Sequence, residues 1–304
     1  MTMRRRVPAL LAFLSLAACQ AGPSSVVLPP AHNAIGEPVD PHARDRLGAT
    51  LWMRDAAEFE ACCRQAFVAA SRTLAAAAAD AKVAALPNTA GDGARLAVIT
   101  DLDETMVDNL LFQEHQVRDG VDFGDAGWTA WVNSGRAGLL PGAAEFLREA
   151  LAMPQVDVFY ISNRTTPDHV AGTLATLRDV DAKLANEPQR LLLKVKGGSS
   201  DKSARRAQVA KDRRVVLLLG DDLGDFVSVP KVDATHGIED VVKARRQLVA
   251  DAGPKWGTTW IVLPNPSYGS WSRVYESPDL EIGHRQRLDR LRGTGAWAPP
   301  APAK

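Results

Sequence analysis

Five short apolar runs recur along the chain, and stretches with helical periodicity separate them. The apolar runs cover residues 96–101, 156–161, 191–195, 215–220 and 259–263. Runs this short, largely apolar and partly β-branched are typical of strands that are buried on both faces of a parallel sheet. The helical segments cover residues 46–86, with Pro87 as the expected end, and 141–153, 166–178 and 201–211. This alternation predicts an α/β fold: a mostly parallel sheet of βαβ units, flanked by helices.

The N-terminus has the pattern of a secretory signal. A basic stretch over residues 4–6 precedes an apolar stretch over residues 9–16, which is too short to span a membrane as a helix. Leu16-Ala17-Ala18-Cys19 follows and resembles a bacterial lipobox, in which the signal is cleaved before a cysteine that is then lipidated. We therefore expect a lipid anchor on Cys19; an ordinary signal peptide with a free Cys19 is the alternative. Gln20 follows the cysteine, which favours the outer membrane by resemblance to sorting rules.

The chain divides into a leader, a tether, one folded domain and a tail. Residues 1–18 are the expected signal peptide, and residues 19–45, rich in Pro, Ser, Gly and Ala, read as a lipidated tether. Residues 46–292 form the expected domain, and residues 293–304 a loose tail. Two segments of the domain, residues 46–86 and the polar, aromatic insert 109–140, are expected to form a small, mostly helical cap.

Composition and charge exclude some classes of function. The chain has 304 residues, of which 46% are hydrophobic and 24% charged, as in ordinary globular proteins. Removal of residues 1–18 takes away three arginines and leaves 33 basic against 36 acidic residues, a net charge of about −3. Without a broad basic surface, a nucleic acid polymer is not expected as a partner. Cys62 and Cys63 lack metal-site spacing, and a bridge between neighbours on a helix is strained, so they read as buried thiols.

The first apolar run ends in the residues from which chemistry is most strongly expected. Asp101 and Asp103 follow it directly in the sequence Thr-Asp-Leu-Asp-Glu-Thr. Open α/β sheets bind their ligands at the carboxyl ends of the strands, which is where these carboxylates are expected. A pair of solvated turn aspartates is the alternative.

Polar groups also stand at the end of the second apolar run and at the start of a later helix. Ser162, Asn163 and Arg164 end the second run, although Ser-Asn after a strand is more often a turn or a helix cap. Lys202 opens a helix, where an anion is favoured, and Lys194 and Lys196 are rivals for the same role. A solvated helix face is the alternative for such a lysine.

The acidic cluster after the fourth run points to a cation. Asp221, Asp222 and Asp225 end that run, and carboxylates crowded at a buried sheet edge repel one another unless a cation is present. Oxygen ligands beside a phosphate favour Mg²⁺. A turn is the alternative for residues 223–225, but it does not explain why four segments end in groups suited to one site.

In the order acid pair, hydroxyl, lysine, acid pair, these motifs resemble the haloacid-dehalogenase (HAD) superfamily. Further segments resemble the class C bacterial acid phosphatases of subfamily IIIB, which are outer-membrane lipoprotein 5′-nucleotidases. The segments are Trp52 with Glu58 and residues 65–67, 101–105, 127–132, 141–146, 160–164, 201–206, 220–226 and 263–269. The resemblance spans about residues 50–275. The sequence departs from it at Asp222, where the family often has Asn, and at Gly224, where it often has Asp.

The resemblance implies a HAD-like fold and a role for each motif. Asp101 is the implied nucleophile and Asp103 the general acid and base, while Ser162 and Lys202 hold the phosphoryl oxygens. The implied Mg²⁺ ligands are Asp101, the Asp103 main-chain carbonyl and Asp221. Asp225 and Asp222 are expected around those ligands, and Asn163 and Arg164 at the substrate. A homodimer is a further implication of the resemblance.

Three aromatic residues bear on specificity. Trp128, Trp131 and Tyr268 stand on loops that the resemblance puts near the site entrance, where flat rings suit a base. The expected substrate is a small phosphomonoester, a nucleoside 5′-monophosphate or nicotinamide mononucleotide. The alternatives are a broad acid phosphatase with aromatics that only pack, a phosphotransferase, a non-catalytic nucleotide-binding lipoprotein, and a structural metal-binding lipoprotein. The histidines at 115, 169 and 284 are assigned no chemistry.

Overall fold

The computed structural model describes residue 32 and residues 39–292, apart from 92, 234, 276 and 278. The expected signal peptide, the lipidation site Cys19 and the tail from residue 293 lie outside the described residues. Within the described part, none of the helices combines the length and the apolar character that crossing a membrane requires.

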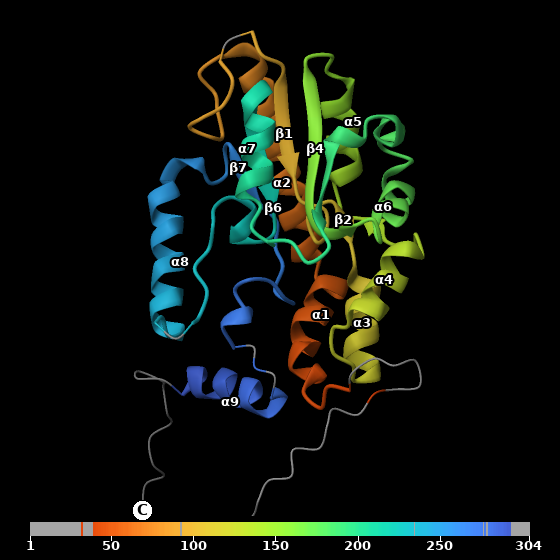
Figure 1. Ribbon diagram of the computed structural model, residues 1–304, viewed down its shortest axis with the longest axis vertical. Coiled ribbons are helices and arrows are strands. Elements are labelled where there is room, and N and C mark those ends of the chain that lie inside the picture. Colours follow the sequence, from red (N-terminus) through yellow and green to blue (C-terminus); the bar gives the residue numbers. More distant parts are fainter. Residues whose placement is uncertain are drawn as a thin grey trace, which may run out of the picture.

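A five-stranded parallel sheet with the order β5-β4-β1-β6-β7 forms the centre of the fold (Figure 1). Its strands are β1 (Leu96–Thr100), β4 (Val156–Thr166), β5 (Leu191–Val195), β6 (Arg214–Gly220) and β7 (Trp260–Val262). Each expected apolar run is a strand of this sheet, which confirms the predicted α/β class. Strands β2 (Val107–Asp108) and β3 (Gly138–Leu139) form a second, two-stranded antiparallel sheet.

Helices cover both faces of the central sheet. One face packs against α2 (Ala57–Ala79), α5 (Ala143–Ala152) and α6 (Val170–Leu177). The other packs against α7 (Ser203–Asp212) and α8 (Ile238–Ala252). Strand β1 shows why its sequence is apolar throughout, because Leu96 and Val98 face the first layer while Ala97 and Ile99 face the second.

The first helical segment differs from the expectation. In place of one helix that ends at Pro87, the chain forms α1 (Leu47–Asp55) and α2, which ends at Ala79. The break falls at Ala56, whose backbone is extended with φ −80° and ψ 123°. Beyond α2 the chain joins the sheet instead, since the Ala85 N–H donates to the Val215 carbonyl of β6 at 2.8 Å. Tertiary packing therefore overrides the high helix propensity of alanine here.

The insert between residues 109 and 140 is helical, whereas α2, from the other segment expected in the cap (residues 46–86), packs on the sheet. The insert holds α3 (Leu110–Asp119) and α4 (Asp125–Asn133), joined by a small core of Phe112, Trp131 and Val132. The sequence patterns did not indicate α8 or the C-terminal α9 (Leu280–Leu291). Short 3₁₀ helices complete the described elements: η1 (Ala43–Arg46), η2 (Ala182–Asn186), η3 (Pro188–Arg190), η4 (Leu223–Asp225), η5 (Gly253–Lys255) and η6 (Arg273–Tyr275).

Candidate active site

The loop after β1 places Asp101 at the carboxyl edge of the sheet. The Asp101 N–H donates to the Leu219 carbonyl of β6 at 3.0 Å, so the hydrogen bonding between β1 and β6 continues to this residue. Its side chain is almost fully buried. The chain then turns sharply, with Glu104 in the left-handed region at φ 55° and its N–H bonded to the Val107 carbonyl. A turn of this kind returns the chain to β2 directly after the two aspartates.

Lys202, at the start of α7, contacts the first aspartate directly. Its ammonium lies 2.5 Å from Asp101 Oδ1 and 2.6 Å from Asp225 Oδ1, and the side chain is buried. Burial alone lowers the pKa of Lys202, but the two carboxylates outweigh it and the net pKa is raised, so the ammonium stays charged. Of the rival lysines, Lys196 is exposed and pairs with Asp168 at 2.8 Å. The structure therefore brings Lys202 to the site.

Three carboxylates converge beside this lysine. One ligand oxygen from each of Asp101, Asp221 and Asp225 lies within 4.8 Å of the others. Burial raises the pKa of Asp101 to about 7; Lys202 opposes this rise, and the charges of Asp225 and Asp103 add to it. Burial, with the charges of Asp225 and Asp101, raises the pKa of Asp221 well above its usual range. Such crowding is relieved by a divalent cation, and this oxygen-only donor set fits Mg²⁺.

Asp225 lies nearer to the other two acids than the sequence suggested, since it was expected only around the ligands. Its Oδ2 accepts the Asp222 N–H at 3.0 Å, which fixes the carboxylate over the end of β6. The close approach requires Gly220, because a Cβ there would lie 2.3 Å from Asp225 Cβ. Asp222 points elsewhere: it accepts the Gly224 N–H at 2.7 Å and the Ser270 hydroxyl at 2.6 Å. Asp222 thus fixes the loop after β6.

Asp103 is held by a buried arginine. Arg164 donates through NH2 to Asp103 Oδ1 at 2.7 Å and through Nε to both oxygens at 3.0 and 3.2 Å. Arg164 is 1% exposed and also binds the Thr173 hydroxyl at 3.0 Å. The Arg164 guanidinium, expected at the substrate, thus orients Asp103 and binds Thr173. Ser162 Oγ, at 3.5 Å from Asp103 Oδ2, lies at the same carboxylate.

Asn163, expected at the substrate, is likewise hydrogen-bonded within the protein. Its amide donates to the Ser200 carbonyl at 3.1 Å and accepts from Arg205 at 2.7 Å. Arg205 also donates to the Ser162 carbonyl at 2.6 Å, and Arg206 donates to the Asp225 carbonyl at 2.9 Å. These two arginines tie α7 to the ends of β4 and β6. Their sequence position beside Lys202 was the only signal for them.

A buried acid beside the site was missed by sequence reasoning. Glu104 is 1% exposed, and burial, with the charges of Asp103 and Asp221, raises its pKa well above the usual range. It accepts from Asn109 at 3.3 Å and from the Tyr268 hydroxyl. Glu104 therefore links the loop after β1 to Tyr268.

The aromatic residues of the cap divide into two kinds. Trp131 is buried, stacks on Phe112 with ring centres 6.2 Å apart, and donates to Asn109 Oδ1 at 2.8 Å. Trp131, expected at the substrate, packs in the core of the cap. Trp128 is half-buried, lies edge-on to Phe112, and has the Arg164 guanidinium 5.9 Å from its ring centre. Trp128 thus adjoins the arginine that holds Asp103.

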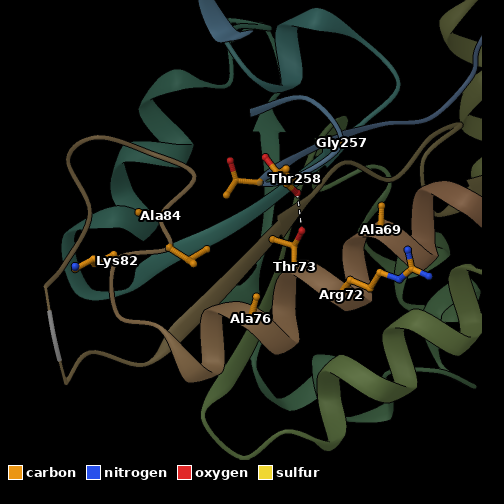
Figure 2. A pocket seen from close by; sticks show the side chains of 10 residues that line it. Ala69, Arg72, Thr73, Ala76, Lys82, Ala84, Gly257 and Thr258 are labelled. Carbon is orange, nitrogen blue, oxygen red and sulfur yellow. Dashed lines mark hydrogen bonds between the residues drawn. The ribbon is translucent and has the colours of Figure 1, made fainter. Parts of the chain in front are cut away.

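A hollow of about 540 Å³ lies elsewhere among the described residues (Figure 2). It is bounded by α2, by residues 82–84 and by residues 257–259, and the Thr73 hydroxyl donates to the Thr258 carbonyl at 2.9 Å. Residues 257–259 lead into β7, so this hollow lies at the amino edge of the sheet, opposite to the carboxylates. No expected site residue lines it.

Comparison with known proteins places these residues in a family. Residues 34–271 match the family described as HAD superfamily, subfamily IIIB (Acid phosphatase). The structure is similar to the class C acid phosphatase from Bacillus anthracis, with 29% identity and a TM-score of 0.70, covering 83% of this chain and 98% of that chain. A structure of the class C acid phosphatase from Bacillus anthracis with tungstate bound is similar at 30% identity, with the same TM-score and coverage.

Proposed function

The chain belongs to subfamily IIIB of the HAD superfamily, the acid phosphatases, and is a phosphomonoesterase; we propose that it works with Mg²⁺ and carries the phosphoryl group on Asp101. The observation that carries this proposal is the buried contact of Lys202 with Asp101, beside Asp221 and Asp225. Lys202 contacts both Asp101 and Asp225, so its positive charge offsets part of the negative charge around the nucleophile.

In the first step, Asp101 attacks phosphorus and the ester oxygen leaves as the alcohol. The P–O bond to the alcohol breaks as the bond to the Asp101 oxygen forms, giving an aspartyl-phosphate. Lys202 favours the ionised form of Asp101 before attack and then faces the transferring oxygens, where negative charge spreads. Ser162 donates to the same oxygens from the end of β4.

Asp103 moves the proton in both steps. It protonates the departing alkoxide, and in its ionised form it then removes a proton from the water that attacks phosphorus. That second attack releases phosphate and restores Asp101. Arg164 orients Asp103 for this task, because its planar guanidinium binds the carboxylate through two nitrogens.

We propose that Asp101, Asp221 and the Asp103 main-chain carbonyl would hold the cation, with Asp225 alongside; the cluster of Asp101, Asp221 and Asp225 supports this. A bound Mg²⁺ supplies positive charge that offsets the crowded carboxylates and the phosphoryl oxygens. Asp221 is oriented for this role by hydrogen bonds to its two oxygens, from Thr105 at 3.1 Å and from Asn265 at 2.9 Å.

We assign a nucleoside 5′-monophosphate or nicotinamide mononucleotide as the substrate. Trp128 and Tyr268 support this, because both are half-buried aromatic side chains beside the site. Trp128 lies next to Arg164, which binds Asp103, and the Tyr268 hydroxyl donates to Glu104. The lipobox-like residues at Cys19 support an outer-membrane lipoprotein, which would act on nucleotides outside the cytoplasm. A homodimer follows from the family resemblance alone.

A substrate panel tests the proposal. Phosphate release is measured for nucleoside 5′-monophosphates, nicotinamide mononucleotide, a sugar phosphate and an aryl phosphate, with Mg²⁺ and with EDTA. We expect EDTA-sensitive turnover that favours nucleotides and is inhibited by tungstate, the oxyanion bound by the relative. Equal turnover of all substrates would refute the nucleotide preference but not the phosphatase. Added nucleoside that captures phosphate would reveal phosphotransfer.

A further inference from the structure

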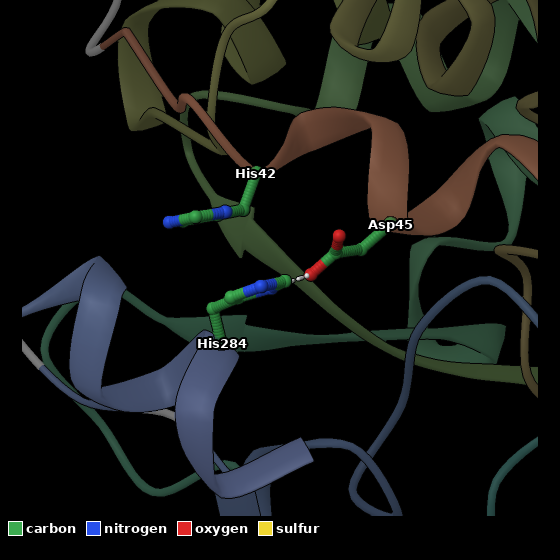
Figure 3. A group of neighbouring side chains, drawn as sticks. All are labelled: His42, Asp45 and His284. Atoms are coloured by element: carbon green, nitrogen blue, oxygen red, sulfur yellow. Dashed lines mark hydrogen bonds and ion pairs between the residues drawn. The ribbon is translucent and has the colours of Figure 1, made fainter. Parts of the chain in front are cut away.

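Two histidines and two acids meet outside the candidate active site. His42 precedes η1 and Asp45 lies within it, whereas Glu281 and His284 belong to α9, over 230 residues later. No sequence pattern links these segments, and His284 was assigned no chemistry. Figure 3 shows the His42 and His284 rings lying one above the other, with Asp45 at the edge of His284.

The contacts of this cluster have the spacing of a metal site. His284 Nδ1 lies 2.7 Å from Asp45 Oδ2, and His42 Nε2 lies 3.0 Å from Glu281 Oε2. The two imidazole rings are parallel within 7°, with centres 4.0 Å apart. One ligand atom from each of His42, Asp45 and His284 lies within 4.8 Å of the others. Ligand atoms around a tetrahedral Zn²⁺ with bonds near 2.0–2.1 Å lie about 3.3 Å apart, and each ring binds an ion in its own plane, so the stacked rings must turn out of parallel on binding.

The side chains have room for that rotation. The exposed fraction is 19% for His42, 33% for Asp45 and 23% for His284, so each side chain is partly open to solvent. Glu281 is 55% exposed and holds the His42 ring by its Nε2. A carboxylate behind a ligating histidine is the arrangement that orients such ligands in known sites.

We propose that His42, Asp45 and His284 form a second metal site, for a divalent transition metal ion such as Zn²⁺. Imidazole nitrogens favour Zn²⁺, Ni²⁺ or Cu²⁺, whereas the oxygen-only cluster of Asp101, Asp221 and Asp225 suits Mg²⁺. The two clusters thus select different ions. Arg287 lies 3.8 Å from Asp45 Oδ2, and its charge opposes the ion.

The ion bound there fastens α9 to the start of the folded chain. Among the described residues of α9, only Gly283 is buried, so the helix gains little from apolar packing. Its attachment rests on polar contacts such as His284 with Asp45 and Arg290 with Glu239. One ion bound to side chains of both segments would hold η1 and α9 together more firmly than the ion pairs between them, because ion pairs at a surface are weak.

Zinc titration of the full chain against a competing indicator tests the site. Unchanged protein, the control His236→Gln and the double variant His42→Gln/His284→Gln are compared; His236 is an exposed histidine that pairs with Asp233. We expect the double variant to bind one equivalent fewer, with affinity at this site at least about 100-fold lower, while His236→Gln matches the unchanged chain. Asp221→Asn should keep the equivalent, since it alters only the oxygen cluster.

Two further measurements test the proposal even if the double variant folds poorly. Arg287→Gln should tighten zinc binding, a gain that unfolding cannot produce. Zinc should also slow hydrogen exchange of the α9 amides in the unchanged chain and not in the double variant. Equal zinc counts in unchanged and double-variant chains, or looser binding in Arg287→Gln, would overturn the proposal.

Discussion

Replacing Arg164 by methionine should lower the free energy of unfolding by about 3–5 kcal/mol. The guanidinium is 1% exposed and makes three contacts of 3.2 Å or less with Asp103, so its removal leaves a mostly buried carboxylate without its partner. The Thr173 hydroxyl loses a donor at 3.0 Å as well. Methionine keeps most of the volume, so lost charge pairing dominates over cavity formation.

Urea unfolding followed by tryptophan fluorescence measures this cost. The matched control is Arg118→Met, whose side chain is 70% exposed and pairs with Asp119, and which should unfold at nearly the same urea concentration as the unchanged chain. A double-mutant cycle with Asp103→Asn should give a coupling of about 1–3 kcal/mol. Arg164→Met should also lower kcat by about 10²–10⁴, and no further than Asp103→Asn does, because Arg164 acts through Asp103. A cost below about 1 kcal/mol, or no coupling, would refute the reasoning.

Three other predictions follow from the site. Gly220→Ala should destabilise the chain by about 1–3 kcal/mol and weaken Mg²⁺ binding, because its Cβ would lie 2.3 Å from Asp225 Cβ; urea unfolding and Mg²⁺ titration measure both. Lys202→Met should lower kcat by about 10²–10³ in steady-state assays, while the exposed Lys196→Met should not. Without metal, the folded chain holds a proton on Asp101 up to about pH 7, since burial raises that pKa, whereas the unfolded chain releases it near 3.8. The metal-free Tm should therefore rise as the pH falls from about 7 to about 4, and Mg²⁺ or Asp101→Asn should reduce that rise; a slope unchanged in Asp101→Asn would count against Asp101 as its source.

The strand ends were predictable because parallel strands bring their carboxyl ends to one edge. Asp101 and Asp221 stand far apart in sequence, yet both follow buried apolar runs, so their meeting follows from the fold class alone. The same reasoning brought Ser162 to that edge. What could be read from the sequence was thus the position of each polar group along its own strand.

The partners of those groups were not predictable from local pattern. Whether Arg164 faces substrate or Asp103 depends on the packing of β4 against the loop after β1, a contact 61 residues apart. Trp131 was expected at the substrate because the resemblance puts its segment near the site entrance. In the structure, Trp131 packs with Phe112 in the core of the cap. Likewise Ala56 interrupts a run of good helix formers because α1 and α2 pack on different neighbours, α3 and the sheet.

The most direct test of the central claim is to trap the phosphoryl group. The full chain is mixed with radiolabelled nucleoside monophosphate and Mg²⁺, quenched in acid within one turnover, and digested for peptide mass spectrometry. The account predicts label on the peptide that contains Asp101, none in Asp101→Asn, and more in Asp103→Asn, where the second step lacks its base. Label on another residue, or turnover with no covalent label in either the unchanged chain or Asp103→Asn, would contradict Asp101 as the nucleophile.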